Sequence, residues 1–171
     1  MLSTDGVDLP VLNVFRMLGR MGGKRLSVTS SADPGVEAMR RKGVRGQADV
    51  SGLASLEDRR LSVLLWHYHD DDVTGPAAEV ALSLESLPYD DGRASVRQYR
   101  IDAEHGNAFE RWKAMGSPAS PTPRQHAELA RAGQLTEIGP AETVDVRNGR
   151  ATLRLTLPRR AVSLLVIEAA H

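Results

Sequence analysis

The sequence has no cysteine and is poor in aromatic residues, with two tryptophans, three tyrosines and two phenylalanines among 171 residues. The lack of cysteine excludes disulfides and thiolate chemistry and leaves the redox compartment open. Net charge is also absent, because 22 basic residues balance 22 acidic ones. No overall electrostatic field would therefore attract nucleic acid or an anionic membrane surface, and we expect neither as a partner.

Long apolar runs are missing as well. No stretch approaches the ~18 uninterrupted apolar residues of a membrane span, and the opening MLSTDGVDLP lacks a basic region followed by an apolar core. We expect neither a membrane span nor a signal peptide, which favours a cytoplasmic location. The remaining composition, with 41% hydrophobic and 26% charged residues, is typical of one soluble globular domain.

Strand periodicity dominates the chain from Lys24 onward. About eight strand candidates lie at 26–28, 50–56, 61–68, 80–85, 96–101, 143–146, 151–157 and 162–167. Short strands at regular spacing, joined by turns, predict a mainly β protein with an antiparallel β-sandwich. The second candidate should be broken around Gly52. The pair Asn148 and Gly149 predicts a hairpin, because both residue types tolerate the positive φ of a tight turn.

Two of these strands, Leu61 to Tyr68 and Val162 to Ile167, are apolar on both faces. The outer face of a free two-sheet sandwich is normally wet, as the alternating Thr152, Arg154 and Thr156 predict for their own strand. A strand that is apolar on both faces needs cover on its second side. Either the helices of this chain supply that cover, or another domain does.

An N-terminal helix is predicted over residues 9–21, beginning near Asp8 and Pro10 and ending in a glycine-rich turn. Its apolar stripe consists of Val11, Leu12, Phe15, Leu18 and Met21. Such a helix can cover the sandwich, pair with a second copy of the chain, or fray. We expect one of the last two outcomes, which leaves a homo-oligomer open.

The stretch from His105 to Leu135 interrupts the strands and predicts a helix, a proline-rich turn and a second helix. The apolar spacing changes there to one helix face, made of Ala108, Phe109, Trp112 and Met115. Gly116 is suited to end this helix because it tolerates positive φ. Thr122 and Gln125 form a capping box around Pro123, so the second helix should run to about Ala132.

Few residues could carry chemistry. His67 and His69, followed by the aspartates 70–72, have the residue types and spacing of a divalent metal site. The favoured interpretation is a strand end whose histidines form local hydrogen bonds and whose aspartates make a solvated turn. We therefore predict no metal and no cofactor.

A glycosidase carboxylate pair could combine Glu104 or Glu110 with Asp70 or Asp102, but retaining chemistry needs carboxyl groups ~5 Å apart, and nothing in the sequence fixes such a distance. No Gly-x-Ser-x-Gly elbow places a serine for attack, so acyl transfer is not supported. No catalytic residue is predicted in this chain.

Four segments together resemble a known family. The run IDAEHGNAFERWKAMGSPASPTP, followed by AELARAGQL, resembles the C-terminal β-sandwich region of glycoside hydrolase family 39 in its β-xylosidase branch, and more distantly the α-L-iduronidases. LPVLNVFRMLGRMGG looks like the last barrel helix of that family, LLWHYHDDDV like a sandwich strand and its turn, and LPRRAVSLLVIE like the closing strand. The likeness covers nearly the whole chain.

The resemblance implies a parent enzyme that cleaves terminal β-xylosides with retention, using two glutamates of a (β/α)8 barrel. A barrel needs roughly 200 residues or more, so it is missing from this chain. We expect residues 1–23 to correspond to the last barrel helix and residues 24–171 to an accessory sandwich with a helical insertion at 105–135. The missing barrel would be the partner, xylosides or xylo-oligosaccharides would be bound through the parent, and this chain alone would be inactive.

The insertion is the expected functional edge, bordering the active site of the parent through His105, Asn107, Phe109 and Trp112. His105 and Asn107, at the helix entrance, should be accessible, whereas Phe109, Trp112 and Met115 should anchor the helix on the sheet. The alternative function is a stand-alone carbohydrate-binding or dimerisation module. Sugar-binding sandwiches stack sugar rings on exposed aromatic side chains, which are scarce here.

Overall fold

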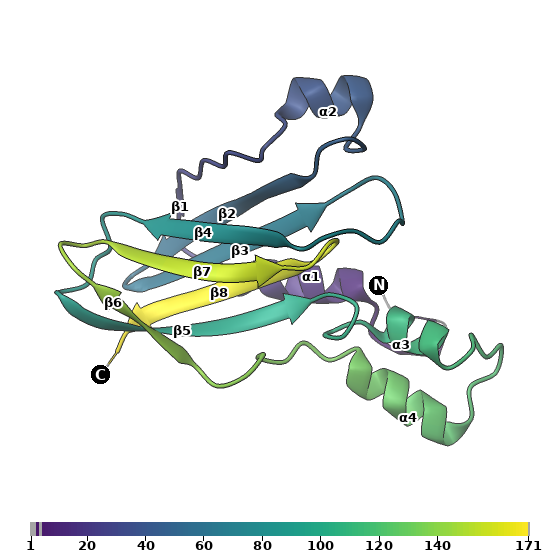
Figure 1. Ribbon diagram of the computed structural model, residues 1–171. Coiled ribbons are helices and arrows are strands. Elements are labelled where there is room, and N and C mark those ends of the chain that lie inside the picture. The colour runs from purple at the N-terminus through teal and green to yellow at the C-terminus, as the bar shows by residue number, and fades with distance from the viewer. Residues whose placement is uncertain (1–2, 4, 171) are drawn as a thin grey trace.

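The computed structural model describes residue 3 and residues 5–170. Within these residues the chain forms eight strands and four helices, with the strands in two antiparallel sheets that pack face to face (Figure 1). The predicted β-sandwich, its N-terminal helix and its two-helix insertion are thereby confirmed. Among the described residues, no helix is long and apolar enough to cross a membrane.

The larger sheet has the strand order β1-β2-β3-β8-β5-β6. Its strands are β1 (Lys24–Leu26), β2 (Asp49–Glu57), β3 (Arg60–Tyr68), β8 (Val162–Ala169), β5 (Gly92–Ile101) and β6 (Glu142–Val146). The smaller sheet pairs β4 (Ala78–Leu84) with β7 (Ala151–Leu157). Trp66 of β3 and Ile101 of β5 both pair with Val162 of β8, so β3 and β5 finish at the same end of the sandwich.

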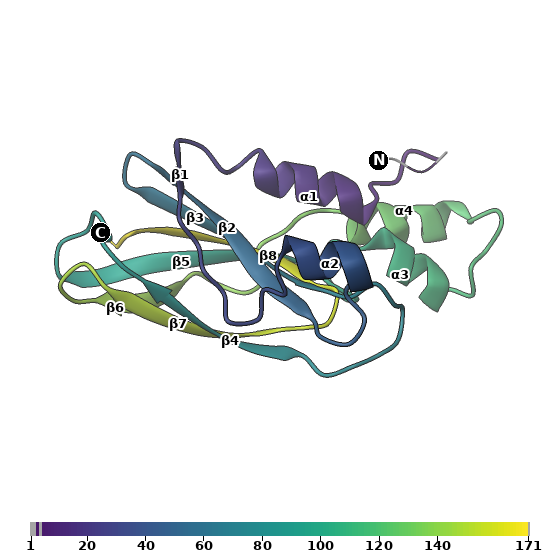
Figure 2. The same cartoon turned by 90° about the horizontal axis from the view of Figure 1, so that it is seen from above.

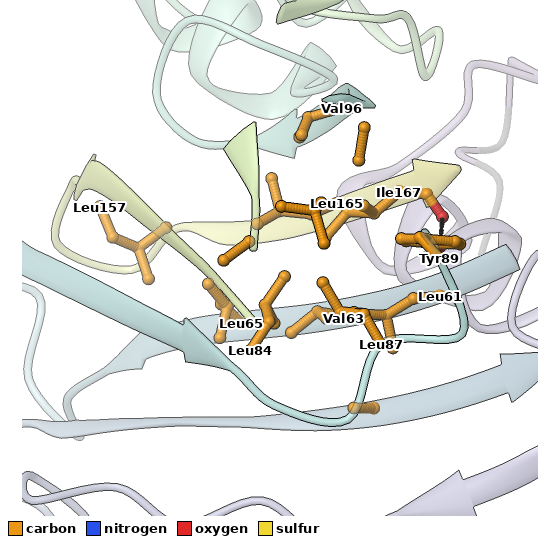
Figure 3. Close-up of a cluster of buried hydrophobic side chains, with 14 of the residues drawn as sticks. Leu61, Val63, Leu65, Leu84, Leu87, Tyr89, Val96, Leu157, Leu165 and Ile167 are labelled. Carbon is orange, nitrogen blue, oxygen red and sulfur yellow. Dashed lines mark hydrogen bonds between the residues drawn. The ribbon is translucent and has the colours of Figure 1, made fainter. Parts of the chain in front are cut away.

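The main core lies between the two sheets (Figure 3). Alternate residues of β3 and β8 point into it, because successive side chains of a strand face opposite sides of the sheet. Its labelled members include Leu61, Val63, Leu65, Leu84, Leu157, Leu165 and Ile167. The Tyr89 hydroxyl donates a hydrogen bond of 2.7 Å to the Ile167 carbonyl, which satisfies the one polar atom that this ring brings into the core.

The other face of the larger sheet is covered by α1 (Pro10–Leu18), which is the outcome that we did not expect. The helix does not fray, and pairing with a second copy stays a prediction. Met17 is fully buried against Leu64, Tyr99 and Leu164 on this face. This second cluster explains why β3 and β8 are apolar on both faces, as the sequence indicated. Figure 2 shows α1 lying along the sheet and meeting the insertion at one end.

The buried face of α1 differs from the predicted stripe. The helix turns Asn13 and Met17 toward the protein, and both are 0% exposed. Three residues of the predicted stripe remain at the surface: Val11, Phe15 and Leu18, with exposed fractions of 47%, 55% and 37%. We call these three residues the outer face of α1. The helix is therefore apolar on two sides, one of which is left uncovered by the residues that the structure describes.

The Asn148-Gly149 turn forms as predicted, but it does not close an ordinary hairpin. Both residues have positive φ, 51° and 67°, and Arg147 and Arg150 form a bridge across the turn. Beyond that bridge the strands separate, since β6 pairs with β5 and β7 pairs with β4. The turn therefore carries the chain from one sheet to the other.

The strand β2 is continuous, so the expected break around Gly52 is wrong. A glycine is needed there because a Cβ atom at this position would lie 2.7 Å from the Leu64 carbonyl oxygen.

The helix α2 (Val36–Lys42) was not predicted. It is short and has no buried residue, so the sequence carries no apolar stripe for it. The insertion holds α3 (Ala108–Ala114) and α4 (Pro123–Ala132), and the capping box of Thr122 and Gln125 is present.

Candidate functional site at the entrance to the insertion

The turn from β5 into α3 is built around the carboxylate of Asp102. This side chain is 7% exposed, and its Oδ1 accepts hydrogen bonds from the backbone N–H groups of Glu104 and His105, each 2.8 Å long. The same oxygen lies 2.9 Å from Nδ1 of the His105 ring. The guanidinium of Arg100 is 3.9 Å from the other carboxylate oxygen. The Asp102 carboxylate therefore stabilises the turn through these hydrogen bonds.

His105 gains a fixed orientation from this contact. Its Nδ1 donates to the Asp102 carboxylate, which leaves Nε2 directed away from that partner, and 39% of the side chain is exposed. A carboxylate that holds one ring nitrogen sets the orientation of the ring. The arrangement gives His105 one accessible nitrogen that could bind a hydroxyl group of a ligand or of a neighbouring domain.

Asn107 has a different position from the one expected. Its Oδ1 accepts a hydrogen bond of 3.1 Å from the Glu110 N–H, which caps α3, and its Nδ2 donates to the Asp102 carbonyl over 2.8 Å. Both ends of the amide are used inside the turn. Asn107 therefore stabilises the turn that presents His105.

Phe109 is not the buried anchor that the helix spacing predicted. It is 47% exposed and stacks on Trp112, with ring centroids 5.8 Å apart and planes 25° from parallel. Trp112 is half-buried, and its indole N–H donates to the Pro118 carbonyl over 3.0 Å. The anchors are Ala108 and Leu129, which pack on Val7, while Trp112 and Met115 lie at the margin of this cluster. An aromatic pair thus remains partly open to solvent on α3.

The insertion and α1 are joined by a buried residue that sequence reasoning missed. The Asn13 amide donates to the Gly106 carbonyl over 2.9 Å and to the Gly133 carbonyl over 2.8 Å. One side chain therefore connects α1 to the start of α3 and to the end of α4. Its Oδ1 accepts a hydrogen bond from Arg16. The available signal was an asparagine inside an otherwise apolar helix, which requires hydrogen-bond partners when it is buried.

A second polar cluster lies at the same end of the sandwich and contains the histidines considered as metal ligands. His67 is buried, with Nδ1 3.0 Å from the Leu157 carbonyl, and its ring centroid is 5.3 Å from that of His69. Nε2 of His69 lies 3.0 Å from the guanidinium of Arg159, which also binds Asp71. A guanidinium at this place opposes binding of a metal cation.

The electrostatics of this second cluster favour a neutral His69. Burial is the main cause that lowers the pKa of His69, and the charge of Arg159 lowers it further. The hydrogen bond from Arg159 lowers the pKa of the Asp71 carboxyl. Among the described residues, no group of three or more histidine, aspartate and glutamate side chains has the geometry to hold a metal ion.

Three of the four carboxylates considered for a glycosidase pair, Glu110, Asp102 and Asp70, have partners, whereas the fourth, Glu104, lies exposed at the surface. Glu110 forms an ion pair of 2.7 Å with Lys113, and Asp102 is held as described above. Asp70 accepts hydrogen bonds from the Val44 N–H at 2.6 Å and from the Tyr68 hydroxyl at 3.0 Å. The hydrogen bond between the Tyr68 hydroxyl and Asp70 is the main cause that raises the pKa of Tyr68. The carboxylates with partners stabilise turns and surface pairs in this conformation.

No protein-family model matches this chain, and no curated protein matches it. Several solved structures have the same fold. The chain superposes over 99% of its length on the GH39 enzyme of Xanthomonas axonopodis pv. citri, with a TM-score of 0.74 and 16% identity. It superposes equally fully on a monomeric β-xylosidase of Caulobacter crescentus CB15, with a TM-score of 0.72 and 16% identity.

A bacterial orthologue of human α-L-iduronidase is also similar, with 24% identity and a TM-score of 0.55 over 72% of this chain. The chain spans about a third of the length of the first two structures, 32% in each case, and 22% of the third. At these identities the similarity establishes the fold. That fold is shared with part of several larger glycoside hydrolase family 39 chains.

Proposed function

We propose that this chain is a non-catalytic accessory β-sandwich domain of a family 39 glycoside hydrolase of the β-xylosidase branch. The observation that carries the proposal is the superposition of almost the whole chain on about a third of GH39 enzymes. In this proposal a separate (β/α)8 barrel supplies the acid/base and nucleophilic glutamates, and it cleaves terminal β-xylosides with retention. The sandwich supports the barrel and borders its substrate site.

The outer face of α1 is the proposed docking surface for the barrel. Val11, Phe15 and Leu18 are exposed although the opposite side of the same helix is already buried on the sheet. A surface helix with only one buried side normally carries polar residues on its other side. An apolar outer face is instead typical of a helix that lies between two layers, which supports residues 1–23 as the counterpart of a barrel helix.

The entrance to the insertion is the proposed border of the active site. His105 has an oriented ring with an accessible nitrogen, and the aromatic pair of Phe109 and Trp112 provides an apolar surface nearby along α3. Together they match the two contacts that proteins use for sugars, namely hydrogen bonds to hydroxyl groups and packing of the sugar ring on an aromatic face. Asn107 contributes by holding this turn in place.

The proposal is tested on the native protein. Antibodies against this chain should recover from its source an assembly or a longer polypeptide that hydrolyses an aryl β-xyloside. In that enzyme, His105→Ala should lower kcat/KM about tenfold through loss of one transition-state hydrogen bond, with little change in melting temperature. Asn107→Ala should lower the melting temperature instead. Recovery of the chain alone, without activity, would refute the proposal.

A stand-alone carbohydrate-binding module is the second candidate, and the exposure of the Phe109 and Trp112 pair favours it. Titration of the isolated chain with xylo-oligosaccharides, followed by tryptophan fluorescence, separates the two functions. Saturable binding that Phe109→Ala removes, without any catalytic partner in the cell, supports the module. Concentration-dependent sedimentation that Phe15→Lys abolishes would instead indicate a dimerisation module built on the outer face of α1.

A further inference from the structure

The sandwich is open along one side, between β4 and the chain that follows β1. A groove of about 750 Å³ runs there between β4 and residues 27–32. Its floor is apolar and belongs to β2 and β3, including Ala54, Leu56 and Val63, and its wall on β4 includes Val80 and Leu82. Figure 1 shows β4 and β7 side by side in front of the larger sheet, and β7 is the strand that pairs with β4. The groove opens directly onto the main core.

The groove arises because the two sheets have unequal widths. Six strands face two, and neighbouring strands are ~4.8 Å apart, so the smaller sheet is too narrow to cover the larger one. On the β7 side, β6 turns into β7 and closes the sandwich. On the β4 side, Leu26 and Leu56 are only partly buried. The uncovered strip is therefore located beside β4 and extends over β2 and β1.

β4 has a free edge in the part of the chain that the structure describes, because its backbone pairs with β7 on one side alone. Proteins normally protect such edges with lysine, proline, bulges or short strands. The edge strand β1 follows this rule, since it has three residues and includes Lys24 and Arg25. β4 has seven residues, AEVALSL, without lysine, arginine or proline. An unprotected edge beside an apolar groove is suited to accept another strand.

The residues around the groove define the chemistry of that strand. The inward residues of β4 are apolar, and the chain on the opposite bank, residues 27–32, is mostly serine and threonine. The charged side chains that line the groove are both acidic. Glu79 lies on the exposed face of β4 and accepts hydrogen bonds from the Thr156 hydroxyl. Glu85 directly follows β4 and forms an exposed ion pair of 3.8 Å with Arg150. They are six residues apart, which is ~20 Å along a strand. A strand paired with β4 would meet one carboxylate near each of its ends.

We propose that this groove binds an extended peptide segment of a protein partner, which pairs with the free edge of β4 and becomes the third strand of the smaller sheet. Its inward positions carry aliphatic side chains that fill the groove above Ala54 and Leu56. Its outward positions carry lysine or arginine opposite Glu79 and Glu85. Main-chain hydrogen bonds supply affinity, and the alternating side chains supply specificity, as in other strand additions. This inference does not depend on the proposed catalytic partner.

A seven-residue probe tests the inference directly. The peptide Lys-Leu-Thr-Val-Thr-Leu-Lys, with blocked ends, places aliphatic residues inward and one lysine near each glutamate. Added to the isotope-labelled chain, it should shift the backbone amide resonances of residues 78–84 and 27–32 in a saturable manner and slow amide hydrogen exchange in β4. The same peptide with an N-methyl group on every residue cannot donate these hydrogen bonds in either register and should not bind.

Charge reversal provides the matched protein control. Glu79 and Glu85 are exposed, and their contacts with Thr156 and Arg150 lie at the surface, so E79K/E85K should leave the fold intact. The variant should bind the lysine peptide roughly fivefold more weakly and should instead prefer a peptide with glutamate at both ends. Absence of saturable shifts with the lysine peptide would overturn the proposal. Equal binding of the N-methylated peptide would overturn it too. Concentration-dependent self-association through β4 would also overturn it, because the edge would then bind a second copy of the chain.

Discussion

Substitution of Asn13 by leucine should weaken the fold although leucine is the better residue for an apolar helix. Asn13 is fully buried and donates to the Gly106 and Gly133 carbonyls, which are also buried. Leucine would leave both acceptors without a partner, and each such group costs about 1–3 kcal/mol. Added apolar burial offsets part of this cost, so the free energy of unfolding should fall by about 2–4 kcal/mol.

Urea unfolding followed by circular dichroism measures this loss, and an unchanged slope of the free energy against urea would show that a change in stability is being observed. Val11→Ala is the control on the same helix, because Val11 is largely exposed and its loss should cost less than about 0.5 kcal/mol. If Asn13→Leu also cost less than about 0.5 kcal/mol, α1 would not be joined to the insertion as described.

Three further predictions concern single groups. Because the pKa of His69 is lowered in the folded protein, the unfolded chain takes up the proton first as the pH falls below the ordinary value of 6.5. The free energy of unfolding should therefore decrease as the pH falls through 6.5 and level off below the lowered native pKa of His69. Urea unfolding at several pH values should show a smaller decrease for the His69→Gln variant. Identical pH profiles of the two proteins would contradict this prediction. Trp112→Ala should lower the free energy of unfolding by about 2 kcal/mol in the same urea assay, since the ring is half-buried. Phe109→Ala should lower it by less than about 1 kcal/mol, because Phe109 is exposed. Equal losses in the two variants would contradict the exposure of Phe109. The purified chain should not hydrolyse an aryl β-xyloside, and turnover that a carboxylate substitution abolishes would disprove this.

Local chemistry predicted those parts of the fold that depend on neighbouring residues. The capping box of Thr122 and Gln125 and the turn at Asn148 involve residues close in sequence, so the amino acids themselves specify them. The apolar character of β3 and β8 on both faces likewise indicated two layers of cover. Such signals were sufficient for the fold class and for the two-helix insertion.

The errors involve contacts between distant segments. Asn13 was missed because its partners are 93 and 120 residues away. Phe109 was assigned to a buried face because helix spacing identifies an apolar stripe but does not reveal which part of it meets another element. The same limitation explains why Asn13 and Met17, rather than the outer face of α1, form the buried side of that helix. For the candidate site, sequence indicated His105 but not Asp102 as the group that orients it.

The outer face of α1 offers the most direct test of the claim that this chain serves a catalytic barrel. A photo-crosslinking amino acid at Phe15, which is 55% exposed, would report what covers this face in the native protein. Mass spectrometry of the products should identify peptides of a (β/α)8 glycoside hydrolase barrel, while the same group at the exposed Thr152 of β7 should not yield them. Crosslinks from position 15 to a second copy of this chain, or the absence of any protein crosslink from this position, would contradict the account.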